Sequence, residues 1–78
     1  MYRKELFIFR TGVDVFDVHI TISLNCYTYD DNDYADYIVQ VYETKTHTLR
    51  EMQFDNILAA KRRFSIEVEK ATIFTNID

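Results

Sequence analysis

Apolar and polar side chains alternate without a break along one stretch in the first third of the chain. The apolar members are Phe16, Val18, Ile20, Ile22 and Leu24, and the polar members are Asp17, His19, Thr21, Ser23 and Asn25. A strict period of two is typical of a β-strand with one buried face and one solvated face. The following Cys26 extends the apolar side, so we expect a sheet that is covered on one face.

Further strands are predicted on both sides of this stretch. Residues 4–10 are rich in Phe, Leu and Ile, and residues 11–14 predict a turn in which Gly12 supplies a positive φ. The other elements expected before the helix are a strand over residues 37–43, a polar turn over 44–47 and a short strand over 48–54.

The C-terminal third predicts a helix. Asp55 is the expected N-cap, because its carboxylate can accept from the free N–H groups of the first turn. Apolar residues then recur at helical spacing at positions 57, 60, 64, 68 and 71. A strand over residues 64–69 is the competing interpretation, since apolar residues also alternate there. The helix is favoured because residues 59–62 are strong helix formers.

Residues 72–77 are expected to return to the sheet as a last strand. The predicted fold class is α+β, with an antiparallel sheet of four to five strands and one helix packed on one face, in the order β-β-β-β-α-β. The chain has 78 residues, no Pro and a single Gly, so we expect one domain over residues 1–78 without a flexible linker.

The candidate catalytic chemistry is sparse. Cys26 is on the apolar side of its strand, where a cysteine usually behaves as a small hydrophobe. His19 is expected on the solvated face beside Asp17 and Thr21, where surface histidines are commoner than catalytic ones. With His47 these residues do not make a metal site. We therefore expect no enzyme activity, no catalytic residue, no metal and no cofactor.

An acidic stretch between two predicted strands is the first candidate binding element. An EF-hand loop needs Gly at its sixth position and Glu at its twelfth, and neither possible register of this stretch provides them. A solvated loop is one interpretation. The other is a protein-binding patch in which tyrosines at positions 27, 29, 34 and 37 cooperate with the carboxylates. The candidate partner-binding residues of this patch are Asp30, Asp31, Asp33, Tyr34 and Asp36.

The first predicted strand is apolar on both faces, with Leu6 and Ile8 on one and Phe7 and Phe9 on the other. If one helix covers one face, Phe7 and Phe9 are left exposed, with Ile38 or Tyr42 beside them. Such a patch predicts a partner protein or a homodimer. The alternative is a central strand that loops cover.

Lys61-Arg62-Arg63 is the only basic cluster, and Arg63 stands four residues before Glu67, with which it can pair. Ile66 falls opposite the apolar helix stripe, so it is either an outward contact or a sign that the helix is wrongly predicted. The net charge of −4 disfavours general nucleic-acid binding.

No stretch is apolar enough to cross a membrane, no signal-type apolar core follows the first residues, and one cysteine fits the cytoplasm.

The segment Leu58-Ala59-Ala60-Lys61-Arg62 resembles short helical stretches in small phage-encoded anti-CRISPR proteins. The small, acidic, cysteine-poor profile is similar too. This resemblance implies a protein-binding inhibitor of the anti-defence type that occludes a site on a larger protein. The alternative is a small nucleic-acid-binding domain that uses a sheet face.

Overall fold

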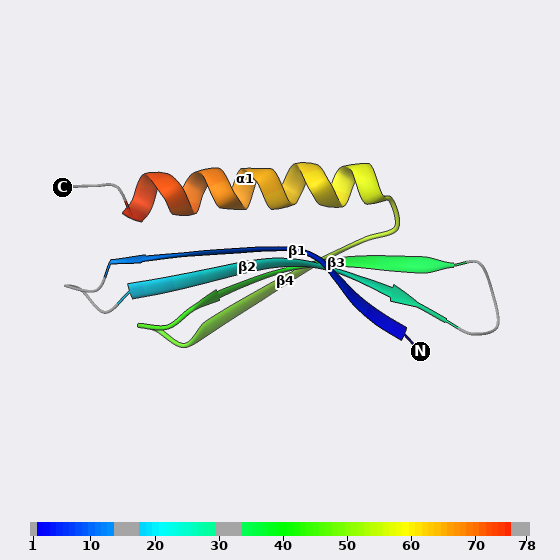
Figure 1. Cartoon of the computed structure of the whole chain (residues 1–78), viewed down its shortest axis with the longest axis horizontal. Coiled ribbons are helices and arrows are strands. Elements are labelled where there is room, and N and C mark those ends of the chain that lie inside the picture. The colour runs from blue at the N-terminus through cyan, green and yellow to red at the C-terminus, as the bar shows by residue number, and fades with distance from the viewer. Residues whose placement is uncertain (1, 14–17, 30–33, 76–78) are drawn as a thin grey trace.

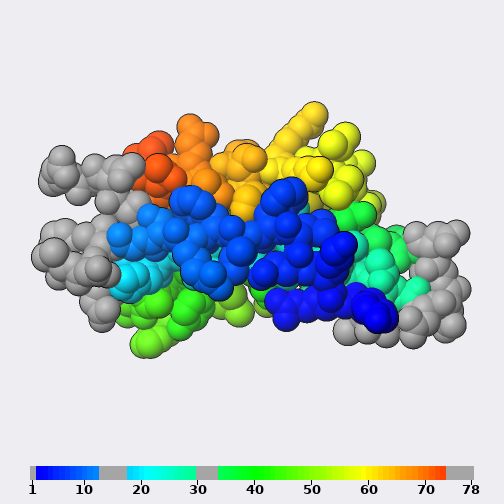
Figure 2. Space-filling model, in the orientation of Figure 1, coloured from blue at the N-terminus to red at the C-terminus, as the bar shows by residue number. Residues whose placement is uncertain are grey.

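A computed structural model describes residues 2–13, 18–29 and 34–75. The elements are β1 (Tyr2–Val13), β2 (Val18–Thr28), β3 (Ala35–Glu43), β4 (Thr48–Phe54) and α1 (Ile57–Thr75). The four strands form one antiparallel sheet in chain order, and α1 lies along one face of it (Figure 1). In the space-filling view the edge strand β1 faces the viewer below α1 (Figure 2). The predicted α+β class is confirmed.

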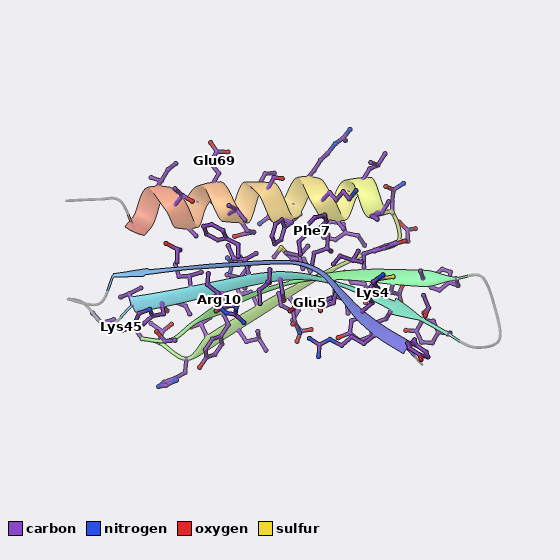
Figure 3. All side chains as sticks on the ribbon, in the orientation of Figure 1. Lys4, Glu5, Phe7, Arg10, Lys45 and Glu69 are labelled. Carbon is purple, nitrogen blue, oxygen red and sulfur yellow. The ribbon has the colours of Figure 1, made fainter. Side chains whose placement is uncertain are left out.

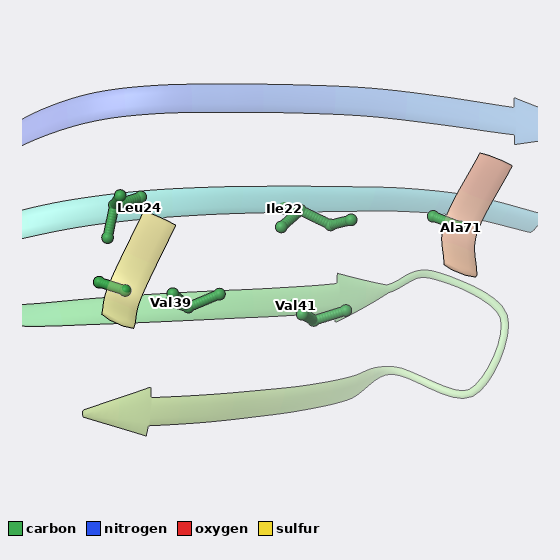
Figure 4. Packing of buried hydrophobic residues seen from close by; sticks show 6 residues of the cluster. Ile22, Leu24, Val39, Val41 and Ala71 are labelled. Carbon is green, nitrogen blue, oxygen red and sulfur yellow. The ribbon is translucent and has the colours of Figure 1, made fainter. Parts of the chain in front are cut away.

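The helix side of the sheet holds the core. Its buried members are Ile22, Leu24, Val39, Val41, Ala60 and Ala71 (Figure 4). They come from the two central strands and from the helix stripe predicted by the spacing of apolar residues. Phe64 and Val68 of the same stripe pack against this cluster. The helical interpretation of residues 64–69 and the buried apolar face of β2 are therefore confirmed. The other face of β2, expected to be solvated, is buried at Ser23 and Asn25, and Phe16 lies outside the described residues.

The helix differs from its prediction at both ends. Residues 72–75 are helical, so the last strand expected over residues 72–77 is wrong there, and residues 76–77 lie outside the described residues. Ala71 is buried against the sheet, and this packing outweighs the β preference of Thr72 and Ile73. The N-cap is Asn56 and not Asp55. Its Oδ1 accepts from the N–H groups of Leu58 at 2.8 Å and Ala59 at 3.2 Å.

The turn predicted over residues 11–14 is wrong for residues 11–13, which continue β1, and residue 14 lies outside the described residues. Gly12 has no positive φ. A Cβ placed on Gly12 would instead clash with the imidazole of His19, the residue opposite it in β2, so glycine leaves room for this ring. The predicted turn over 44–47 is confirmed, and there His47 takes a φ of 54°.

A β-bulge decides which side chains of β1 face the helix. Glu5 lies opposite Asn25 and Phe7 lies opposite Leu24, so Leu6 is an extra residue in β1. Leu6 packs on the core, and Phe7 and Phe9 then also face the helix side, while Ile8 faces away from it. The expectation that Phe7 and Phe9 lie on the uncovered face is therefore wrong. The alternative of a central strand is wrong too, because β1 is an edge strand.

Candidate partner-binding site

The end of β2 and the start of β3 lie beyond the start of α1 (Figure 1). Residues 27, 29 and 34, at or next to these strand ends, are tyrosines. The hydroxyl of Tyr29 donates to Oδ2 of Asp36 over 3.1 Å. The rings of Tyr29 and Tyr34 are tilted neighbours with centroids 6.4 Å apart. Tyr27 lies directly opposite Asp36 in the β2–β3 pairing. We call Tyr27, Tyr29, Tyr34 and Asp36 the tyrosine end.

The rings at the tyrosine end are accessible while the carboxylate beneath them is not. Tyr29 is 38% exposed, Tyr34 is 52% exposed and Asp36 is 7% exposed. The hydrogen bond to Asp36 raises the pKa of Tyr29, with burial and the negative charge of Asp36 adding to it. That negative charge is also the largest cause of the raised pKa of Tyr34. The Tyr29 hydroxyl directs its single proton to Asp36, so its oxygen can accept a hydrogen bond from a donor group of a partner.

The residues of the predicted acidic patch do not all lie in the same kind of environment. Asp36 belongs to β3 rather than to a loop, and it is buried in a hydrogen bond. Tyr34 remains at the surface, whereas Tyr37 faces the helix side and packs on the core, so it does not join the tyrosine end. The remaining predicted residues, Asp30, Asp31 and Asp33, lie outside the described residues.

The other predicted pair, Phe7 and Phe9, lies apart from the tyrosine end, under α1. Figure 3 shows Phe7 between the helix and the sheet. Its ring centroid is 5.8 Å from that of Phe64 and 5.8 Å from Nζ of Lys61. Phe7 nevertheless remains 45% exposed at the edge of this layer, while Phe9 packs on the core. Phe7 is therefore the accessible member of the pair.

The sheet face turned away from α1, which we call the open face, holds a polar network that the sequence pattern does not indicate. Asn25 is fully buried there although no helix covers it. Its Oδ1 accepts from Nη2 of Arg3 at 3.3 Å, and its Nδ2 donates to Oγ of Ser23 at 3.2 Å and to Oε1 of Gln40 at 3.4 Å. The alternation of β2 shows only that these residues are polar. Their burial follows from the register of the neighbouring strands.

The rest of the described open face is of mixed charge. Glu5 and Arg10 lie on this face, opposite Asn25 and Thr21 of β2 (Figure 3). Glu51 of β4 lies opposite Gln40 of β3. Basic and acidic groups thus occur together on this face, and these residues give no indication of a continuous basic surface for phosphates.

The residues considered for catalysis are separated. His19 is half-buried, and its imidazole lies against Gly12. Its expected neighbour Asp17 lies outside the described residues. Cys26 lies on the helix side, opposite Tyr37. Within residues 2–13, 18–29 and 34–75, no three His, Cys, Asp or Glu side chains gather as metal ligands would.

The predicted pair of Arg63 and Glu67 is confirmed, with 2.7 Å between Nη2 and Oε1. A second cation, which the sequence pattern does not indicate, also pairs with Glu67: Nη2 of Arg50 in β4 lies 3.0 Å from its other carboxylate oxygen. Ile66 is 42% exposed and points outward, which agrees with its interpretation as an outward-facing residue of a correctly predicted helix.

Comparison with known proteins adds no relative. No protein-family model, curated protein or solved structure matches this chain. Among the described residues, no helix combines the length and the apolar character needed to span a membrane.

Proposed function

We propose that this chain is a non-enzymatic protein-binding module whose recognition element is the tyrosine end. The observation that carries the proposal is the pair of accessible rings, Tyr29 and Tyr34, held over the buried carboxylate of Asp36. A tyrosine offers a large apolar surface and a polar tip, and few of its rotamers are lost on binding, which is why tyrosines are common in binding sites.

The partner that this site suits is a protein that presents arginine or lysine side chains. A guanidinium or ammonium group can stack on a tyrosine ring, and nearby carboxylates can pair with it. Asp30, Asp31 and Asp33 add negative charge to the same segment of the chain, and the net charge of −4 favours encounter with a basic surface. By covering such a surface, a module of this size would block a site on a larger protein.

The wider role that we propose is inhibition of a nucleic-acid-binding protein, in the manner of anti-defence proteins. A basic surface of the kind described above is what nucleic-acid-binding proteins use to contact phosphates. The single cysteine is consistent with action in the reducing cytoplasm.

Affinity capture from extract of the native host tests the proposal, with the wild-type chain and two variants as baits. The first variant, Tyr29→Ala with Tyr34→Ala, removes both rings. The matched control is Tyr42→Ala, because Tyr42 is as exposed as Tyr29, at 38%, but lies near the opposite end of β3. We expect the same protein to bind the wild type and the control and to be lost from the double variant.

Circular dichroism of the three baits shows whether each is folded. A partner that binds the folded double variant as well as it binds the wild type would contradict the proposed site. Equal loss of binding in the double variant and in the Tyr42→Ala control would also contradict it, because binding would then not depend on the tyrosine end.

A further inference from the structure

The two edges of the sheet are unlike each other. β4 is short, with 7 residues, and charged residues Arg50 and Glu51 stand near its middle. Both features protect an edge from pairing with another chain. β1 has 12 residues, and its middle is Phe7-Ile8-Phe9, of which Phe7 is 45% and Ile8 39% exposed. In the described chain β1 pairs with β2 alone, so its outer backbone N–H and C=O groups face outward.

We propose that β1 pairs antiparallel with β1 of a second copy of this chain, about a two-fold axis at Ile8. We count positions along β1 by the residues opposite them in β2, because this count leaves out the extra residue of the bulge. Ile8 lies opposite Ser23, while the strand ends, Tyr2 and Val13, lie opposite Thr28 and Val18. Each end is thus five strand positions from Ile8. An axis at Ile8 therefore overlaps β1 with its copy over its whole length.

The same register is complementary in charge. Glu5 lies opposite Asn25 and Arg10 lies opposite Thr21, so each is two positions from Ile8, on opposite sides. In the dimer each Glu5 faces Arg10 of the second copy, and the pair occurs twice by symmetry. Arg3 and Lys4 face the uncharged Gly12 and Thr11 of the second copy. Moving the axis by two positions instead places Arg10 against Arg10, or Glu5 against Glu5, which is unfavourable.

The faces of the strand match as well. Glu5, Ile8 and Arg10 lie on the open face, and Phe7 and Phe9 lie on the helix side. Each Phe7 then faces Phe9 of the second copy, so the exposed part of the Phe7 ring becomes covered. Aromatic pairs of this kind are favourable between neighbouring strands. The product is a closed dimer with one eight-stranded sheet, both helices on the same face and no free β1 edge.

Light scattering over a dilution series tests the charge pairs. Glu5→Arg and Arg10→Glu, each alone, place like charges opposite each other twice and should weaken the dimer by about tenfold or more. Combining the two changes restores opposite charges and should bring the dissociation constant back to within about threefold of wild type. The control Glu51→Arg, on the open face of β4, should change nothing. Circular dichroism checks the fold of every variant.

Oxidative cross-linking tests the position of the axis, in a Cys26→Ala background that removes the native thiol. Ile8→Cys should form a disulfide with itself, because residues opposite each other across antiparallel strands have Cα atoms about 4.5–5.5 Å apart. Glu51→Cys, on the other edge, should not. A wild-type monomer at all concentrations would overturn the proposal. So would a dimer unaffected by the single reversals, cross-linking of Glu51→Cys alone, or growth into open polymers, which would indicate pairing of β1 with β4.

Discussion

Glu67 of α1 and Arg50 of β4 form an ion pair across the helix–sheet interface, with Oε2 and Nη2 3.0 Å apart. Glu67 is 2% exposed, and its second oxygen binds Arg63, one helical turn earlier. Both oxygens of a buried carboxylate are thus satisfied by cations that remain partly in solvent. The arrangement joins the middle of the helix to the β4 side of the sheet.

Glu67→Gln should lower the free energy of unfolding by about 1.5–3 kcal/mol, the range for hydrogen bonds to charged groups. The amide keeps the size of the side chain but loses the charge and one acceptor. Glu69→Gln is the matched control, because Glu69 is exposed and points away from the sheet (Figure 3). Its effect should stay within about 0.5 kcal/mol. Urea unfolding measures both, and equal effects would contradict the role given to Glu67.

The same carboxylate should make stability depend on acid pH. Burial raises the pKa of Glu67, but the hydrogen bond and charge of Arg50, with the charges of Arg63 and Lys70, outweigh it, so the pKa lies below the ordinary value of 4.5. A lowered pKa in the folded state stabilises the fold above the unfolded-state pKa, and this contribution is lost as pH falls through the folded-state pKa. The stability difference between wild type and Glu67→Gln should therefore be constant near neutrality and shrink below about pH 4.5. A difference that persists unchanged to pH 3 would contradict this account.

Phe64→Ala should destabilise the domain by about 3 kcal/mol, the lower part of the range for truncating a buried Phe, because the ring is half-buried. The change removes contacts with the core and with the Phe7 ring. Ile66→Ala, two residues along the same helix and exposed, is the control and should alter stability by no more than about 0.5 kcal/mol. Thermal unfolding compares the two. A larger effect at Ile66 would mean that the helix is rotated from the orientation described.

Gly12→Ala should cost about 1 kcal/mol or more, because the new methyl group meets the imidazole of His19. The same change in a His19→Ala background should cost less, since the obstructing ring is gone. A double-mutant cycle from urea unfolding gives this coupling energy directly. If the two effects are additive, the close approach of these residues does not determine the need for glycine.

The sequence predicts much of the fold because its strongest patterns agree with the packing. The alternation in β2 correctly indicates the face that carries Ile22 and Leu24, and the helical spacing through Phe64 and Ala71 gives the correct helix face. Two features could not be predicted. The bulge at Leu6 is a property of pairing with β2, and it turns Phe7 and Phe9 to the other face. The β preference of residues 72–75 is local, and helix packing overrides it.

The candidate site could be predicted only as a segment. Its composition of Tyr and Asp indicates where an interaction surface would lie along the chain. Which members share a face depends on the start of β3, which places Asp36 beneath Tyr29 and turns Tyr37 into the core. The fully buried Asn25 was missed for a related reason, since an alternating pattern distinguishes polar from apolar residues but does not show which polar residues a neighbouring strand covers.

The most direct measurement of the proposed function is amide hydrogen exchange of the chain alone and in complex with the protein that it captures. Peptides covering Tyr27, Tyr29, Tyr34 and Asp36 should gain the largest protection on binding, while peptides from α1 should change little. The protected region would then coincide with the tyrosine end. Protection confined to α1 or to β4, with none at the tyrosine end, would show that the partner binds elsewhere and would contradict the account.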